Sequence, residues 1–237
     1  MCGYLRRHVT PRDLKAFLDL LGVKSNDIDW GENEPAYDIP KLEHFYPAWG
    51  GNTSRTIKKL LVEEQGELKL VDATWWYHAQ EVDGQVVLGS KKTFNARNLH
   101  YAFWSNAINY RRAIAIVTGV GEGKNVNGKD VHYLIESDDF LLLGAVYQRF
   151  PSGQYTCSII TRDSDPQYQP YHENSFPLFL PNDAETLKLW LGTATTDHPK
   201  IKALLDNPKV VNDLAITPVK TFKDAVPTGP TEYLKVE

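Results

Sequence analysis

Apolar residues near the start of the chain recur with the spacing of an amphipathic helix. The apolar stripe comprises Leu14, Phe17, Leu18 and Leu21. Thr10 is a suitable N-cap, Pro11 suits the first helical position, and Asp13 completes a capping-box pattern. Gly22 provides a stop signal. The pattern therefore predicts one short helix that begins near residue 11 and ends before residue 22.

The middle of the chain has a different pattern, with short apolar runs separated by turn residues. Runs at 57–62 and 68–77 flank Glu64-Gln65-Gly66, which predicts a hairpin. Further strands are expected at 113–120, 131–136, 140–147, 155–161 and 176–180. Further helices are expected at 99–110, 182–191 and 199–205, and residues 23–56 resemble a loop.

Strands predominate in this pattern, and short turns join several of them. The sequence therefore predicts an α+β fold with a curved, mostly antiparallel, barrel-like sheet flanked by helices. A single domain is expected over residues 1–217. The tail at 218–237 contains Pro and Gly in quick succession, so it is expected to be loosely ordered.

Composition narrows the class of protein. The chain has 237 residues, a net charge of −4 and 42% hydrophobic residues, which permits a sizeable core but not duplex binding by bulk charge. A membrane-spanning helix needs about 18 consecutive apolar residues, and no apolar run in the chain is that long. The N-terminus also lacks the apolar core of a secretory signal. We expect a cytoplasmic protein, monomeric, with no membrane partner.

Metal and cofactor chemistry is not expected. The only cysteines are Cys2 and Cys157, and the sequence contains neither a CxxC pair nor an HExxH motif. The glycine-rich residues 119–123 do not match GxGxxG. Cys157 lies in an alternating apolar run and is assigned to the core.

Cys2 is the first candidate for chemistry, because removal of Met1 would make it the N-terminal residue. Its α-amine and thiol would then have reference pKa values of about 7.7–8.0 and about 8.5. Such a 1,2-aminothiol condenses with an aldehyde to form a thiazolidine ring. A cysteine at position 2 also occurs by chance, so this feature alone is weak.

Four other polar residues follow apolar runs. Asn95 and Arg97 share one face at i, i+2 spacing, Glu122 lies just past a strand, and His172 lies in a polar loop. Taken singly, each fits a structural role at least as well as a catalytic one.

Their combination resembles the SRAP family, the SOS response-associated peptidase-like proteins. The matching segments are Met1-Cys2-Gly3, Tyr46-Pro47-Ala48-Trp49-Gly50, Thr74-Trp75-Trp76-Tyr77, Phe94-Asn95-Ala96-Arg97, residues 111–122 and residues 158–180. They occur in the family's order along almost the whole chain. The resemblance implies covalent capture of abasic sites in single-stranded DNA, together with autoproteolytic processing of the N-terminus.

The resemblance also implies roles for individual residues. Cys2 would be the nucleophile, Asn95 would position it, Glu122 would tune the amine and carry a proton, and His172 would act as acid and base on the sugar. The implied DNA-binding residues are Arg97, Arg111, Arg112, Trp49, Trp75 and Trp76. The tryptophans would serve equally well as core residues.

The departures from the family pattern include three single residues. Tyr4 stands where an arginine is usual, Leu99 where a glutamate is usual, and Gly123 where a tryptophan is usual. Two alternatives therefore stay open. One is a cysteine peptidase with His172 as the base, and the other is a non-catalytic module that binds single-stranded DNA.

Overall fold

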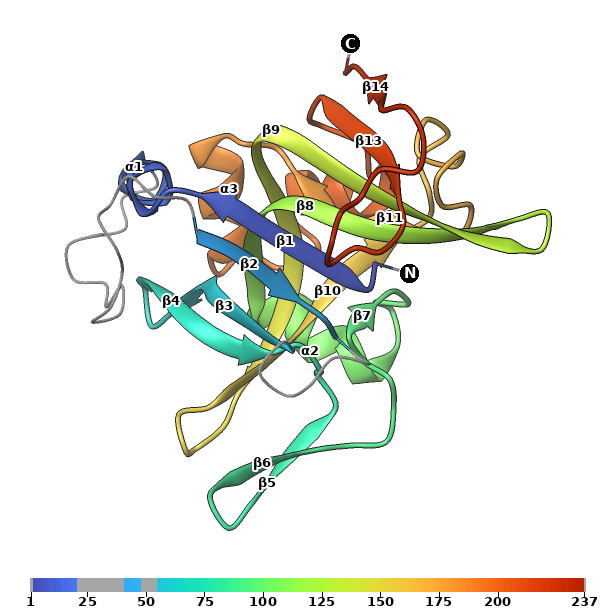
Figure 1. The fold of residues 1–237 in the computed structure, drawn as a ribbon. Coiled ribbons are helices and arrows are strands. Elements are labelled where there is room, and N and C mark those ends of the chain that lie inside the picture. Colours follow the sequence, from blue (N-terminus) through green and yellow to red (C-terminus); the bar gives the residue numbers. More distant parts are fainter. Residues whose placement is uncertain (1, 21–40, 48–54, 237) are drawn as a thin grey trace.

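The computed structural model describes residues 2–20, 41–47 and 55–236 (Figure 1). Its main sheet contains β1 (Tyr4–Val9), β2 (Lys41–Phe45), β3 (Thr56–Glu64), β4 (Glu67–Thr74), β7 (Asn95–Ala96), β8 (Arg112–Val126), β9 (Lys129–Arg149), β10 (Tyr155–Arg162), β11 (Phe176–Pro177), β12 (Phe179–Leu180), β13 (Leu214–Val219) and β14 (Glu232–Leu234). A separate hairpin consists of β5 (Ala79–Val82) and β6 (Gln85–Leu88). The helices are α1 (Pro11–Leu20), α2 (Ala102–Tyr110), α3 (Ala184–Leu191) and α4 (Pro199–Asp206).

Five strands of the main sheet close into a barrel. β3 pairs with β4 and β8, β8 pairs with β9, and β10 joins β9 to β4. Only the β10–β4 pairing in this ring is parallel, with Tyr155 opposite Ala73. The predicted α+β fold with a mostly antiparallel, barrel-like sheet is therefore confirmed.

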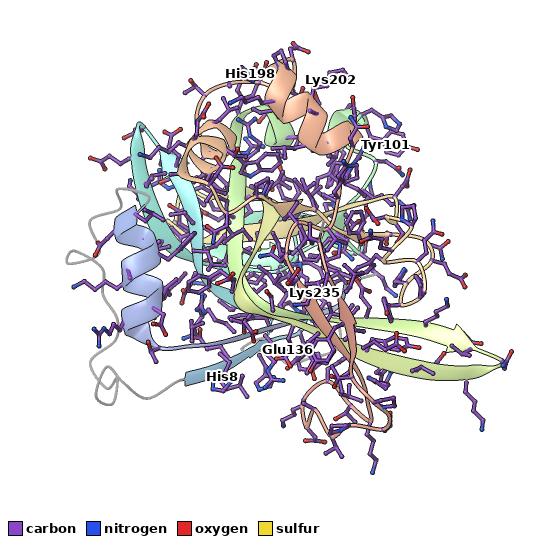
Figure 2. All side chains as sticks on the ribbon, turned by 90° about the horizontal axis from the view of Figure 1, so that it is seen from above. His8, Tyr101, Glu136, His198, Lys202 and Lys235 are labelled. Carbon is purple, nitrogen blue, oxygen red and sulfur yellow. The ribbon has the colours of Figure 1, made fainter. Side chains whose placement is uncertain are left out.

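The strands expected at 131–136 and 140–147 form one continuous strand, β9. Ser137, Asp138 and Asp139 have the composition of a turn, but they lie within a strand that extends beyond the barrel. The register with β8 shifts at this point: Val117 lies opposite Leu141 and Gly119 lies opposite Glu136, so the extra residues form an irregularity in β9. The far end of the β8–β9 hairpin extends beyond the rest of the sheet (Figure 2).

The first helix follows the sequence pattern. Thr10 and Asp13 form a reciprocal capping box: the Asp13 backbone N–H donates to Thr10 Oγ1 at 3.1 Å, and the Thr10 N–H donates to Asp13 Oδ2 at 3.3 Å. Leu14, Phe17 and Leu18 are buried, as the stripe predicts. No helix in the described parts of the chain is long and apolar enough to cross a bilayer.

One segment expected to be a loop contains a strand. β2 lies within the predicted loop at 23–56 and pairs antiparallel with β1. The Asp83-Gly84 turn joins β5 to β6, and both residues have positive φ values, 50° and 73°. This is the conformation that a tight two-residue hairpin turn requires.

The C-terminal segment is more ordered than its composition predicts. β14 pairs with β13, which pairs with β9, so residues beyond 218 extend the main sheet. Phe222 stacks on Tyr4 at a ring-centroid distance of 5.2 Å. A Cβ atom at Gly121 would lie 2.7 Å from the Phe222 ring, so this packing requires glycine. The prediction of a loose tail therefore differs from the structure for residues 218–236.

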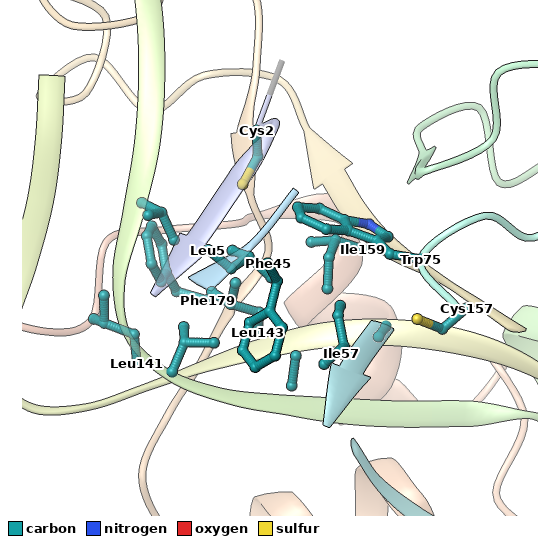
Figure 3. Packing of buried hydrophobic residues seen from close by; sticks show 14 of the residues in the cluster. Cys2, Leu5, Phe45, Ile57, Trp75, Leu141, Leu143, Cys157, Ile159 and Phe179 are labelled. Atoms are coloured by element: carbon teal, nitrogen blue, oxygen red, sulfur yellow. The ribbon is translucent and has the colours of Figure 1, made fainter. Parts of the chain in front are cut away.

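Buried apolar residues fill the interior in two large clusters. One of them contains Leu5, Phe45, Trp75, Ile159 and Phe179, and Cys2 lies at its edge (Figure 3). The N-terminal segment is thereby fixed against the core of the sheet.

Candidate active site

Cys2 lies two residues before the start of β1 and is fully buried. Its thiol points toward the Tyr4 carbonyl oxygen, with Sγ 3.9 Å from that oxygen. Burial raises the pKa of the Cys2 thiol well above its usual value, and the charge of Glu122 raises it further. The thiol is therefore neutral at physiological pH unless a nearby group accepts its proton.

Asn95 reaches Cys2 from another part of the sheet. It lies in β7, which runs parallel to β10 with Asn95 opposite Ile159. Its Nδ2 donates a hydrogen bond to the Cys2 backbone carbonyl at 3.0 Å. Its Oδ1 is buried and has no hydrogen-bond partner among the described residues. Asn95 thus fixes the Cys2 backbone and retains a free acceptor.

Glu122 is positioned by the pairing of β8 with β1. The two strands are antiparallel and Tyr4 lies opposite Gly121, so Glu122 lies beside the residues that precede Tyr4. The side chain is fully buried, and burial raises the pKa of Glu122 to about 7. The positive charge of the amino terminus opposes this rise. At neutral pH the carboxyl group can both donate and accept a proton.

His172 comes from the loop that follows β10, and it is largely buried. Its Nε2 lies 3.7 Å from Glu122 Oε2. The Asn174 backbone N–H donates to Nδ1 at 3.3 Å, so the neutral ring has its proton on Nε2, facing Glu122. Burial first, and then the charges of the amino terminus and Arg97, lower the pKa of His172 to about 4.

The loop that presents His172 is fixed at both ends. Ser164 Oγ donates to the His172 carbonyl at 2.8 Å. Lys124 Nζ, on the β8–β9 hairpin, donates to the carbonyls of Gln169 and Pro170 at 3.3 and 3.0 Å. His172 is therefore held in place before any substrate binds.

These contacts unite four residues from separate parts of the chain. Asn95 donates to the Cys2 carbonyl, the charge of Glu122 raises the pKa of the Cys2 thiol, and His172 Nε2 lies 3.7 Å from Glu122 Oε2. The arrangement offers a nucleophile at the amino end, a carboxyl group that titrates near pH 7, and a neutral imidazole. No three His, Cys, Asp or Glu side chains in the described ranges are grouped for a metal ion.

The family model for "SOS response associated peptidase (SRAP)" matches residues 1–223. The chain belongs to the SRAP family. This confirms the resemblance seen in the sequence, and it places the chain in a family associated with the SOS response. No curated protein matches the chain.

Solved structures support the SRAP fold. A protein from Bacteroides thetaiotaomicron is 18% identical with a TM-score of 0.63, and 97% of each chain is covered. A protein from Bordetella bronchiseptica is 16% identical with a TM-score of 0.63, covering 93% of this chain and 100% of that one. A phage-related protein from the same organism is 18% identical with a TM-score of 0.63, covering 95% and 100%. At these identities the likeness concerns the fold alone.

Among the DNA-binding residues expected from the SRAP resemblance, Arg97 is exposed and close to the site. Its Nη2 donates to Asp163 Oδ1 at 2.8 Å. Its charge contributes to the lowered pKa of His172, so the guanidinium lies within electrostatic reach of the imidazole. Arg97 is therefore accessible to a phosphate beside the site.

Arg112 and Arg111 have a different environment. Arg112 is buried, and its guanidinium donates to the backbone carbonyls of Ile108, Asn109, Trp190, Gly192 and Ala194. Arg111 is half-buried and donates to the Tyr147 carbonyl at 3.2 Å and to the Tyr77 hydroxyl at 3.1 Å. The expectation that Arg112 contacts a DNA phosphate is therefore corrected, because its N–H donors are already bonded to carbonyl groups inside the protein.

The expected base-stacking residues also lie mostly in the interior. Trp75 is fully buried, and its Nε1 donates to the Phe94 carbonyl at 2.6 Å. Trp76 is 9% exposed and donates to the Gly89 carbonyl at 3.0 Å. The stacking role is corrected to core packing for Trp75, and little of the Trp76 surface is accessible. Trp49 lies outside the described residues.

Two of the departures from the SRAP pattern are also core residues. Tyr4 is fully buried, and its hydroxyl is hydrogen-bonded to His44 Nδ1. Leu99 is 8% exposed and packs in the second apolar cluster. Sequence reasoning also missed Tyr168, a second buried side chain in the His172 loop. The available signal was its position four residues before His172, the spacing of one helical turn.

Proposed function

We propose that this protein captures abasic sites in single-stranded DNA covalently, through a thiazolidine formed by Cys2 after Met1 is removed. The observation that carries the proposal is the convergence of Asn95, Glu122 and His172 on the Cys2 end of the chain. An abasic deoxyribose interconverts with a ring-opened aldehyde, which is the electrophile that a 1,2-aminothiol traps.

The side chains support each proton transfer in this reaction. As the sugar ring opens, His172 passes its Nε2 proton to the ring oxygen and regains one from Glu122, whose carboxylate takes up the proton that the C1 hydroxyl releases, so both groups end as they began. The Cys2 amine then adds to the aldehyde carbon, and loss of one water gives an imine. Glu122 carries one proton from the nitrogen to the former aldehyde oxygen as the amine adds, and then a second along the same route, so that this oxygen leaves as water. Asn95 holds the Cys2 carbonyl, so the amine and thiol are oriented before the DNA binds.

Ring closure completes the capture. The thiol loses its proton to Glu122, the sulfur bonds to the imine carbon, and the electron pair of the C=N bond moves to nitrogen. The nitrogen then takes a proton from Glu122. Neither an oxidant nor a metal is required, and the only product that leaves is water.

The peptidase alternative receives less support from the geometry. A cysteine peptidase needs a thiolate next to an imidazolium. Here the pKa of the Cys2 thiol is raised and that of His172 is lowered, and the imidazole faces Glu122. We retain autoproteolytic removal of Met1 as part of the proposal, because Cys2 is the residue that such a step would expose.

The test is incubation of the purified protein with a single-stranded oligonucleotide containing one abasic site, followed by denaturing electrophoresis. A covalent complex is expected for the natural chain. It should disappear when one glycine is inserted between Met1 and Cys2, because the thiol is kept but the 1,2-aminothiol is lost. Equal cross-linking by both forms, or none by either, would contradict the proposal. Turnover of unrelated peptides would favour the peptidase.

A further inference from the structure

The loop between β10 and β11 buries three residues, and two of them precede Ser175. Among residues 163–174, only Tyr168 and His172 are buried. The His172 backbone N–H donates to the Tyr168 carbonyl at 3.2 Å, which closes one helical turn between them. The two side chains therefore point from the same turn toward the interior.

The Tyr168 ring is held firmly by aromatic neighbours. It lies 5.5 Å from the Phe176 ring and 6.3 Å from the Phe179 ring, measured between centroids. It belongs to the same buried cluster as Cys2. The ring therefore has a fixed position at the edge of the capture site.

The hydroxyl group of Tyr168 has an unusual environment for a buried polar group. Tyr168 Oη is buried and has no hydrogen-bond partner among the described residues. Leaving a buried hydroxyl without a partner is unfavourable, so such a group calls for an explanation. Burial raises the pKa of Tyr168, and the charges of Glu122 and Cys2 raise it further. The hydroxyl is therefore a permanent donor within electrostatic reach of both reacting groups.

We propose that Tyr168 is a further residue of the capture site, whose hydroxyl donates a hydrogen bond to the Cys2 sulfur during ring closure. As Glu122 takes the thiol proton, negative charge moves onto a sulfur surrounded by apolar side chains. A preorganised O–H donor stabilises that charge until the sulfur bonds to the imine carbon. Tyr168 keeps its own proton throughout.

This inference rests on the proposed function, and the test separates the two capture steps. Borohydride reduces the imine to a stable amine, so the cross-link formed in its presence reports the first step. The cross-link that forms without borohydride reports ring closure. Tyr168→Phe removes only the hydroxyl and keeps the ring contacts, so its thermal midpoint should match or exceed that of the natural chain.

For Tyr168→Phe we expect imine trapping at the natural rate and ring closure slowed about tenfold, the range for loss of one transition-state hydrogen bond. The matched control is Tyr171→Phe, in the same loop. Its hydroxyl donates to the exposed Glu232 at 2.7 Å, so neither step should change. Unchanged ring closure in Tyr168→Phe, or equal slowing of both steps, would overturn the assignment. If the natural chain forms no cross-link at all, the proposed function fails instead.

Discussion

The residues around Cys2 lie together at one site, whereas the residues first expected to contact DNA lie in different environments. Asn95, Glu122 and His172 converge from separate strands and loops, and Asn95 donates directly to the Cys2 carbonyl. The residues expected to contact DNA do not lie together in this way. Arg97 is exposed beside the site, whereas Arg112 is buried among backbone carbonyls.

This difference shows what a sequence motif can and cannot specify. An arginine provides five N–H donors, and these fit a phosphate and a group of helix-terminal carbonyls equally well. Residue type alone therefore does not separate a DNA contact from a structural clamp. Burial and existing hydrogen bonds do separate them, and the following predictions test that separation.

The largest effect is expected from Arg112→Met. It leaves several buried carbonyls without donors, so we expect the free energy of unfolding to fall by at least about 3 kcal/mol. Arg97→Gln should change it by less than about 0.5 kcal/mol, because the Arg97–Asp163 pair is exposed. Urea denaturation of both variants measures this contrast. Similar losses of unfolding free energy in the two variants would contradict the distinction between a buried structural arginine and an exposed arginine that contacts DNA.

The next effect concerns Asn95→Ala. Loss of the hydrogen bond to the Cys2 carbonyl should slow covalent capture about tenfold, since one such bond contributes on the order of 1 kcal/mol. Affinity for undamaged single-stranded DNA should not change. Cross-linking rates and equilibrium binding, measured on the same preparation, check both statements. A parallel loss of affinity would show that Asn95 acts on DNA binding rather than on Cys2.

The Glu122–His172 pair predicts opposite pH dependences of stability. The pKa of Glu122 is raised from 4.5 to about 7, so its contribution is fully present below pH 4.5 and is lost as the pH rises through about 7. The pKa of His172 is lowered from 6.5 to about 4, so stability increases as the pH rises from about 4 to 6.5. The two effects offset each other between about pH 4.5 and 6.5.

Single substitutions should expose each slope. Glu122→Gln should make stability rise with pH in this window, and His172→Gln should make it fall, each by up to about 1.4 kcal/mol per pH unit. Urea midpoints at pH 5, 5.5, 6 and 6.5 would record the slopes. Slopes of the same sign in both variants would contradict the assigned protonation states.

The smallest effect is expected at the Arg97–Asp163 pair. Asp163 competes with a DNA phosphate for the Arg97 guanidinium, so Asp163→Asn should raise affinity for single-stranded DNA about two- to threefold. Arg97→Gln should lower affinity and reduce the slope of log affinity against log salt by about 0.7. Fluorescence anisotropy at several salt concentrations measures both. An unchanged salt slope in Arg97→Gln would show that Arg97 does not bind a phosphate.

Much of the fold could be predicted from the sequence, because the barrel strands are apolar runs between turn residues. β1 could not be predicted, since Arg6, Arg7 and His8 make it look polar. In the structure Arg7 is buried and paired with Glu43 on β2, and Arg6 forms an ion pair with Glu136 on β9 at 3.3 Å. Such long-range charge pairing leaves no periodic signal in the chain.

The candidate site could be predicted only through the family resemblance. Its contacts span large sequence separations: Asn95 is 93 positions from Cys2, and His172 is 50 positions from Glu122. Tyr168 was missed because its loop is otherwise polar. Its spacing of four residues from His172 is compatible with a shared turn, and the structure shows that this turn directs both side chains inward.

Intact-mass measurement after incubation with an abasic single strand tests the central claim most directly. The account predicts a covalent species whose mass equals the chain without Met1 plus the oligonucleotide, minus one water. The species should form without reductant and should be absent for Cys2→Ala under the same conditions. Finding only the separate masses of protein and DNA, with Met1 removed, would contradict the account.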